Sequence, residues 1–198
     1  MNRSLRIAIA DDEEATRVYL RELLTGLGHQ VVVASSGRQL VEQCKQFAPE
    51  LIITDVRMPD LSGVEAATAV NRDKETPVIL ISGHQNPGVL DTPGCDAVMA
   101  YLVKPLKPAD VEMAIAVALM RFEQLHAARK EARELRQALE DRKLIERAKG
   151  IVMRRLCVDE HEAFQRMKRF ASNHNRKLVD VSEAVLTAEE IFHHLDAL

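Results

Sequence analysis

Polar side chains that could take part in phosphoryl chemistry follow four apolar segments in the first half of the chain. Each segment is short and rich in Ile, Leu, Val or Ala, as is typical of a strand buried in a parallel sheet. Because ligand sites in open parallel sheets lie beyond the carboxyl ends of the strands, we expect these side chains to converge at one edge. The segments and the residues that follow them are Leu5–Ala10 with Asp11 and Asp12, Leu51–Thr54 with Asp55, Val78–Ile81 with Ser82, and Ala97–Val103 with Lys104.

The chemistry that fits this set is transfer of a phosphoryl group to an aspartate. Converging carboxylates repel one another, and Mg2+, which is usually held by one or two carboxylates, water and phosphate oxygens, would offset that repulsion. Asp55 is the candidate nucleophile and would accept the phosphoryl group as an acyl phosphate. The metal and Lys104 would neutralise the phosphoryl oxygens, and the hydroxyl of Ser82 would donate a hydrogen bond to the product.

Strands and helices alternate along residues 1–120, which predicts a doubly wound α/β fold with five parallel strands and right-handed crossovers. Apolar residues at helical spacing mark a helix after most of the strands, and Val31–Val33 supplies the strand that carries no candidate site residue. Residues 84–94 are the exception. They contain two prolines and two glycines, so we expect a short or poorly formed helix there.

Residues 1–120 resemble the receiver domain of two-component response regulators, a flavodoxin-like fold. The resemblance implies that a histidine kinase phosphorylates Asp55 and that Ser82 and Tyr101 reposition afterwards. It also implies that the backbone carbonyl of Arg57 completes a Mg2+ site formed with Asp11, Asp12 and Asp55, and that the Lys104–Pro105 bond is cis. The residues that carry the resemblance are Asp11, Asp12, Asp55 with Met58 and Pro59, Ser82, Tyr101, and Lys104 with Pro105.

The overall composition is that of a globular protein large enough for two small domains. The chain has 198 residues, of which 46% are hydrophobic and 29% charged, and this balance supports ordinary hydrophobic cores. No apolar run approaches the ~20 residues that cross a bilayer, so we expect no membrane segment and a cytoplasmic location. Three widely spaced cysteines without a CxxC pair support neither a disulfide framework nor a zinc site.

Charge is distributed unevenly along the chain. Residues 1–120 carry 11 Lys and Arg against 16 Asp and Glu, residues 121–177 carry 16 against 9, and residues 178–198 carry none against 5. A basic segment is usually a solvated helical surface. A basic segment confined to the region behind a phosphoacceptor domain instead favours an anionic partner.

A long helix is predicted to join the two parts of the chain, because residues 109–149 contain neither glycine nor proline. Its apolar stripe slips by three residues near Leu125, which resembles a coiled-coil seam with a stammer. Two interpretations remain open: self-association along residues 121–138, which would give a homodimer, or packing of the stripe on the chain's own first domain. The stripe consists of Ile115, Ala118, Phe122, Leu125, Ala128, Ala132, Leu135 and Leu139.

Residues 139–198 predict a small all-α domain of three helices. The first continues the long helix to Leu156, and Gly150 within it costs about 0.5–1 kcal/mol relative to alanine, which indicates a close approach by a partner helix or a ligand. The second begins after Asp159, the predicted N-cap, with Glu162 three residues later as in a capping box. The third has a 4-3-4-3 spacing that predicts a buried stripe of Val181, Val185, Ala188, Phe192 and Leu195.

This C-terminal segment resembles the ANTAR domain, an RNA-binding antiterminator module of some response regulators. The resemblance rests on Ala148-Lys149-Gly150 within Ile145–Met153, on Glu162-Ala163-Phe164 and on Asn173–Leu178. It implies binding to paired RNA stem-loops, whose formation prevents a transcription terminator from folding. Cys157 stands where the family commonly turns on glycine, so we expect a different geometry in that turn.

Basic residues on the predicted helices are the candidates for RNA contact, because cationic helices can hold phosphates and unpaired loop bases are the usual targets of sequence-specific RNA readers. Phe164, Phe170 and Phe192 all fit core positions, so arginine would have to do any stacking on bases. The candidate contacts are Arg142, Lys143, Lys149, Arg154, Arg169, Arg176 and Lys177.

The predicted organisation is a receiver domain over residues 1–120, a helical coiled-coil-like linker over residues 121–138, and an ANTAR-like domain over residues 139–198. The leading hypothesis is a response regulator in which phosphorylation of Asp55 switches an RNA-binding antiterminator. Two alternatives stay open: a protein partner sequesters the RNA module in place of phosphorylation, or the output domain binds duplex DNA. The chain has no room for an enzymatic output domain and no second constellation of candidate catalytic residues.

Overall fold

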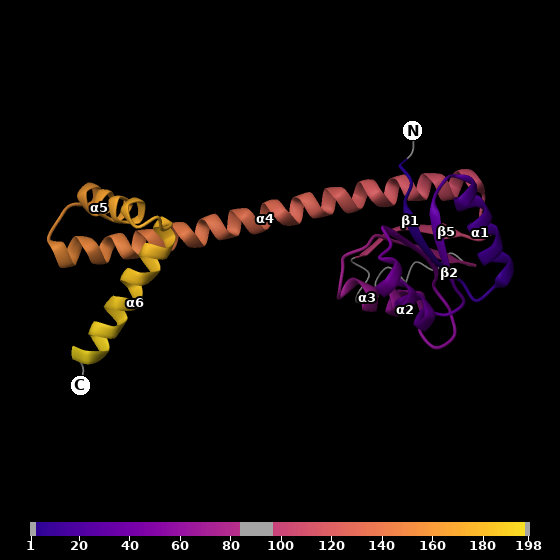
Figure 1. Ribbon diagram of the computed structural model, residues 1–198, viewed down its shortest axis with the longest axis horizontal. Helices are drawn as coiled ribbons and strands as arrows, with labels where there is room; N and C mark the ends of the chain where they lie inside the picture. The colour runs from indigo at the N-terminus through magenta and orange to yellow at the C-terminus, as the bar shows by residue number, and fades with distance from the viewer. Residues whose placement is uncertain (1–2, 84–96, 197–198) are drawn as a thin grey trace. The chain divides into compact units, whose positions relative to one another are not determined.

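A five-stranded parallel sheet with the strand order β2-β1-β3-β4-β5 forms the centre of the first part of the chain (Figure 1). The computed structural model describes residues 3–83 and 97–196. This strand order and the helical crossovers confirm the predicted doubly wound fold. The strands are β1 (Arg6–Ala10), β2 (Gln30–Ala34), β3 (Leu51–Asp55), β4 (Val78–Ser82) and β5 (Val98–Val103).

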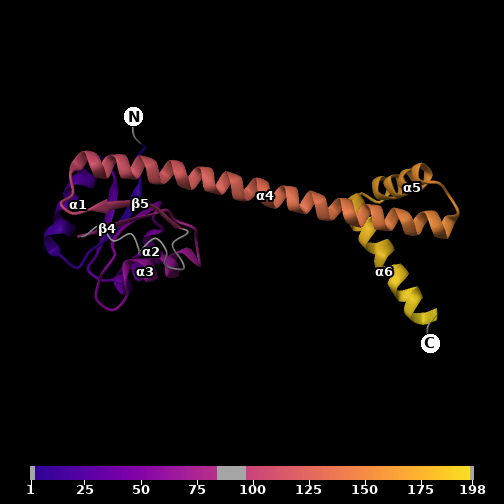
Figure 2. The same cartoon turned by 180° about the vertical axis from the view of Figure 1, so that it is seen from behind.

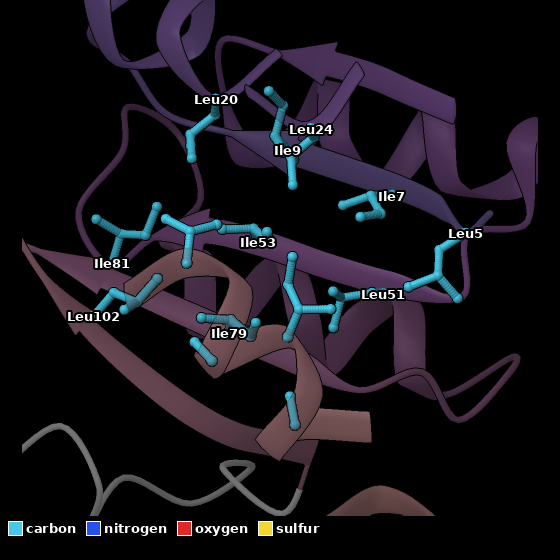
Figure 3. Packing of buried hydrophobic residues seen from close by; sticks show 14 of the residues in the cluster. Leu5, Ile7, Ile9, Leu20, Leu24, Leu51, Ile53, Ile79, Ile81 and Leu102 are labelled. Carbon is cyan, nitrogen blue, oxygen red and sulfur yellow. The ribbon is translucent and has the colours of Figure 1, made fainter. Parts of the chain in front are cut away.

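The strands are apolar along their whole length because both faces of the sheet are covered. Every residue of β3 and β4 is buried. Helix α1 (Glu14–Gly26) and residues 111–118 pack on one face, whose buried side chains are shown in Figure 3. Helices α2 (Gly37–Phe47) and α3 (Gly63–Asn71) pack on the other. The poorly formed helix predicted for residues 84–94 lies outside the described residues.

The strand register brings the candidate site residues to the same edge of the sheet. Ala10 pairs with Thr54, which places Asp11 beside Asp55 at the ends of β1 and β3. Ser82 pairs with Val103, the residue before Lys104. The order of the strands therefore sets the neighbours of Asp55 before any side chain is considered.

Helix α4 (Pro108–Leu156) is continuous over 49 residues and confirms the predicted long helix. The chain divides into two compact units within it, one over Met1–His126 and the other over Ala127–Leu198. Within the described residues, a Cβ added at Gly150 would come near only one side chain, the guanidinium of Arg154 at 3.8 Å. The described residues therefore supply no close approach that would require a glycine there. No helix in the part of the chain that the structure describes is long and apolar enough to cross a membrane.

The second unit packs α5 (Glu160–Asn173) and α6 (Leu178–Asp196) against the last turns of α4 around Ala148, Ile151 and Met167 (Figure 2). Asp159 caps α5 as predicted, since its side chain accepts a hydrogen bond from the N–H of Glu162 at 2.8 Å. The carboxylate of Glu162 binds Arg166 at 2.7 Å and does not complete the capping box.

The turn before α5 corrects the prediction made for Cys157. Its φ of 53° lies in the left-handed region, the conformation for which a glycine is usually chosen. The exposed cysteine therefore adopts the glycine-like geometry in place of a different one.

The predicted burial of the aromatic residues and of the α6 stripe is wrong in part. Phe170 is 48% exposed and Phe192 is 54% exposed, and Leu195 is exposed as well. The buried residues of α6 are Val181, Ser182 and Leu186. The apolar contacts of α6 with α4 and α5 end at Leu186. Beyond it, the described contacts with α4 are those of Arg154 and Arg155 with Glu189 and of Arg155 with the ring of Phe192, so the end of the stripe stays largely exposed.

Candidate functional site

Three charged side chains meet at the carboxyl edge of the sheet. The ammonium nitrogen of Lys104 lies 3.0 Å from Oδ2 of Asp11 and 3.6 Å from Oδ1 of Asp55. Asp11 follows β1, Asp55 ends β3 and Lys104 follows β5, so three strands position one cluster. Asp12 is exposed. Its charge still acts on Asp55, because it contributes to the raised pKa of that carboxyl group.

The loop after β3 orients the carboxylate of Asp55. The backbone N–H of Arg57 donates to Oδ2 at 2.8 Å, which leaves Oδ1 facing Lys104. Helix α3 approaches this loop closely at Gly63, whose N–H donates to the carbonyl of Val56 at 3.1 Å. A Cβ at position 63 would lie 2.0 Å from the carbonyl oxygen of Asp55, so only glycine allows this approach.

Burial sets the electrostatics of the two inner carboxylates. It raises the pKa of Asp55 and of Asp11, although the N–H of Arg57 acts in the opposite direction on the first and that of Glu13 on the second. Burial alone would lower the pKa of Lys104, but its hydrogen bonds with Glu13 and Asp11 outweigh that effect and raise it. The site thus holds a firmly charged ammonium between carboxylates that are costly to ionise.

Glu13 is a site residue that the reasoning from sequence missed. Its Oε2 lies 2.8 Å from the ammonium of Lys104, and this hydrogen bond is the main reason that the pKa of Glu13 lies below its usual value. The side chain is largely exposed, at 62%. The available signal was its position directly after Asp11 and Asp12, which makes it a third acid at the end of the same strand.

The acidic residues suit a hard divalent cation, although they do not form a three-ligand cluster. Among the described residues, no group of three His, Cys, Asp or Glu side chains is arranged to hold a metal ion. Oδ2 of Asp11 is buried, and although it lies 3.0 Å from the ammonium of Lys104, it accepts no well-directed hydrogen bond from the described residues. Because Mg2+ needs only one or two carboxylates when water and phosphate complete its shell, Asp11 and Asp55 fit such an ion.

Ser82 and Tyr101 lie on the neighbouring strands β4 and β5, of which β5 is at the edge of the sheet. Ser82 is buried at the end of β4, and its carbonyl accepts a hydrogen bond from the N–H of Lys104 at 2.9 Å. Tyr101 packs with the core beneath α2 and α3, and its hydroxyl is buried without a hydrogen-bond partner in residues 3–83 and 97–196. The Lys104–Pro105 peptide bond is cis, as predicted.

Six of the seven basic residues predicted to contact RNA fall into two groups in the second unit. Four of them are exposed and have no carboxylate partner among the described residues: Arg142, Arg169, Arg176 and Lys177. Lys143 forms an ion pair with Glu140 at 2.7 Å, and Arg154 lies 3.9 Å from Glu189. The first group is therefore the more available to an anionic ligand.

Lys149 differs from the other candidates because it is buried, with 8% of its surface exposed. Its ammonium lies 2.5 Å from Glu146 and 2.6 Å from Glu160, and these two carboxylates raise its pKa. Glu160 begins α5, so the ion pair ties that helix to α4. Lys149 is therefore less available to RNA than the exposed candidates, and its assignment as an RNA contact stays a prediction.

Comparisons with known proteins agree with both halves of this geometry. Residues 7–116 match the model of the response regulator receiver domain, and residues 133–186 match that of the ANTAR domain. The transcriptional regulatory protein PdtaR of Mycobacterium tuberculosis is 34% identical over 182 residues, which cover 91% of this chain and 89% of PdtaR. The chain belongs to the response regulators that join a receiver domain to an ANTAR domain.

Solved structures resemble the receiver domain of this response regulator. A receiver domain protein from Clostridium thermocellum has a TM-score of 0.55 at 27% identity and covers 61% of this chain and 98% of its own. The chemotaxis protein CheY4 of Vibrio cholerae has the same TM-score at 24% identity, covers 59% and 99% of the two chains, and supports the fold alone. The ANTAR match ends at residue 186, so the exposed apolar turns of α6 lie beyond it.

Proposed function

We propose that this response regulator accepts a phosphoryl group on Asp55 from a sensor histidine kinase and thereby switches an ANTAR domain that binds paired RNA stem-loops and prevents transcription termination. The observation that carries the phosphoacceptor role is the position of Oδ1 of Asp55, 3.6 Å from Lys104 within a cluster completed by Asp11. Because the proposed target is RNA during transcription, the proposed location is the cytoplasm.

The proposed phosphorylation assigns a separate role to each residue. Oδ1 of Asp55 attacks phosphorus as the bond to the donor breaks, while the N–H of Arg57 holds Oδ2. The ammonium of Lys104 offsets the negative charge of the phosphoryl oxygens, and the hydroxyl of Ser82 donates a hydrogen bond to the product. Mg2+ bound by Asp11, Asp12, Asp55 and the carbonyl of Arg57 would supply further neutralisation of charge. Tyr101, whose buried hydroxyl has no described partner, is the proposed aromatic of the switch.

The proposed output is contact between the basic surface of the second unit and RNA. Arg142, Arg169, Arg176 and Lys177 support it, because they are exposed and carry no described ion pair. A homodimer through residues 121–138 would present two such surfaces to two stem-loops. Leu135, which is 64% exposed, would lie in that interface, and Leu139, which is 54% exposed, directly follows it.

One binding experiment separates the leading function from its alternatives. The full chain is mixed with a pool of tandem stem-loop RNAs and with duplex DNA as competitor, with and without beryllofluoride and magnesium. We expect tight RNA binding only by the protein loaded with beryllofluoride and magnesium. In Asp55→Asn, these additions should not increase the affinity for RNA. RNA binding that ignores loading would favour sequestration by a protein partner, and preference for duplex DNA would contradict the RNA assignment.

A further inference from the structure

Two aromatic rings lie stacked on the surface at the end of α5. The ring of Phe170 is 48% exposed, and the imidazole of His174 stacks on it with ring centroids 4.0 Å apart and planes 21° apart. Exposed phenylalanine has no polar atom to hydrate, so a half-exposed ring in a small domain is a candidate contact for a ligand with an aromatic face.

The turn that follows α5 holds the imidazole in this position. Nδ1 of His174 lies 2.9 Å from the carbonyl oxygen of Phe170, and because a carbonyl only accepts, Nδ1 must donate. Asn175 then adopts a left-handed conformation, with φ of 49°, and the chain turns into Arg176 and Lys177. Nε2 of His174 has no partner among the described residues and can hydrogen-bond a ligand.

Most of the basic residues that surround the stack along the chain have no carboxylate partner. Between Glu162 and Asp180 the chain has five Lys and Arg residues and no acid. Within the residues that the structure describes, only Arg166 of these five is paired with a carboxylate, that of Glu162. The other four are Lys168, Arg169, Arg176 and Lys177. An aromatic stack among unpaired cations matches a ligand that carries both a base and phosphates.

We propose that the stack of Phe170 and His174 is the platform on which an unpaired base of the RNA loop lies, while the neighbouring cations bind the flanking phosphates. This assignment rests on the proposed RNA-binding function and names the part of the protein that distinguishes a loop from a stem. Paired bases in a stem cover each other's faces, so only an unpaired base can stack on the protein.

The second exposed phenylalanine of this unit provides an internal contrast. Phe192 is 54% exposed, but the guanidinium of Arg155 lies 5.5 Å from its ring centroid and is itself bound to Glu189 at 2.9 Å. Residues 187–198 contain three acids and neither Lys nor Arg. An acidic setting disfavours a polyanion, so Phe192 is a matched control at similar exposure.

The test measures binding of the full chain, loaded with beryllofluoride and magnesium, to two RNA probes. The first is a pool of tandem stem-loops with randomised loops, and the second has the same stems with each loop replaced by a hexaethylene glycol linker. Stacking on one base contributes enough that Phe170→Leu should weaken binding to the looped pool by about 5- to 100-fold. Binding to the linker-closed stems should not change. Phe170→Tyr should bind as the wild type, and Phe192→Leu should do so too.

The results distinguish a failure of the platform from a failure of the proposed function. Wild-type binding that prefers loops, together with an unchanged Phe170→Leu, would overturn the platform and leave RNA binding intact. A wild type without preference for loops would contradict the proposed function and the platform together. Equal weakening of both probes by Phe170→Leu would also overturn the platform, and thermal unfolding of each variant shows whether the domain is folded.

Discussion

The ammonium of Lys104 lies closer to Glu13, at 2.8 Å, than to Asp55, at 3.6 Å. An exposed glutamate therefore shares the cation that the phosphoryl group on Asp55 would need. Any phosphoryl group that arrives must compete with Glu13 for Lys104, and this competition makes Glu13 a site at which the phosphorylation rate can be changed without altering Asp55.

Glu13→Gln should raise the affinity for beryllofluoride and speed phosphorylation by acetyl phosphate. The gain should reach at most about fivefold, because a solvent-exposed ion pair contributes little. Lys104→Gln should abolish both. Phosphoprotein gels with acetyl phosphate measure the rate, and a slower Glu13→Gln protein would show that Glu13 assists phosphorylation and does not compete with it.

The raised pKa values of Asp55 and Asp11 predict how stability depends on pH. A carboxyl group whose pKa is higher in the folded protein favours folding when it is protonated, and this contribution is lost as the pH rises from the ordinary value of 3.8 through the raised one. Asp55→Asn keeps the shape without the charge. The stability of Asp55→Asn relative to the wild type should therefore increase as the pH rises above 3.8, because only the wild type loses this contribution.

Thermal unfolding at several pH values, without and with magnesium, tests this dependence. Magnesium should raise the unfolding midpoint of the wild type by mass action and have a smaller effect on Asp55→Asn. Equal stability of the two proteins at neutral pH and low magnesium would contradict a destabilising charge at Asp55.

Gly63→Ala should damage both stability and the site. A methyl group 2.0 Å from the carbonyl oxygen of Asp55 forces α3 away from the phosphoacceptor loop, at a cost of about 1–3 kcal/mol. Phosphorylation should slow because Asp55 moves relative to Lys104. Gly26→Ala is the control, since a Cβ there meets nothing within 4 Å in the described residues. A Gly63→Ala protein with wild-type stability and phosphorylation would show that the loop can yield.

The receiver site was predictable because strand ends carry strong signals. An apolar segment followed by a charge identifies a strand and its site residue together, and parallel pairing then brings Asp11, Asp55 and Lys104 to one edge. Glu13 was not identified as a site residue because an acid at the start of α1 is usually a solvated side chain. The direction of a side chain in an exposed turn does not follow from periodicity.

The second unit was less predictable because its three helices bury only part of their apolar faces against one another. Helical spacing identified α6, but it assigned Phe192 and Leu195 to a core that only the first turns of the helix reach. Gly150 suggested a close approach, yet its position is open except for Arg154. Spacing tells which residues share a face of a helix, whereas the length of the neighbouring helix decides how much of that face is covered.

Lys149 and Arg169 should respond differently to the loss of their charge. Lys149→Gln removes the ion pairs with Glu146 and Glu160 and leaves two carboxylates facing a buried amide, so the unfolding midpoint of the second unit should fall. Arg169→Gln alters an exposed side chain without a described partner and should leave that midpoint unchanged. Its effect should appear in RNA binding, as a lower affinity whose dependence on salt falls by about one unit of slope. If instead Lys149→Gln kept its stability and lowered the salt slope, its ammonium would be a phosphate contact, and the two carboxylates would have to release it when RNA binds.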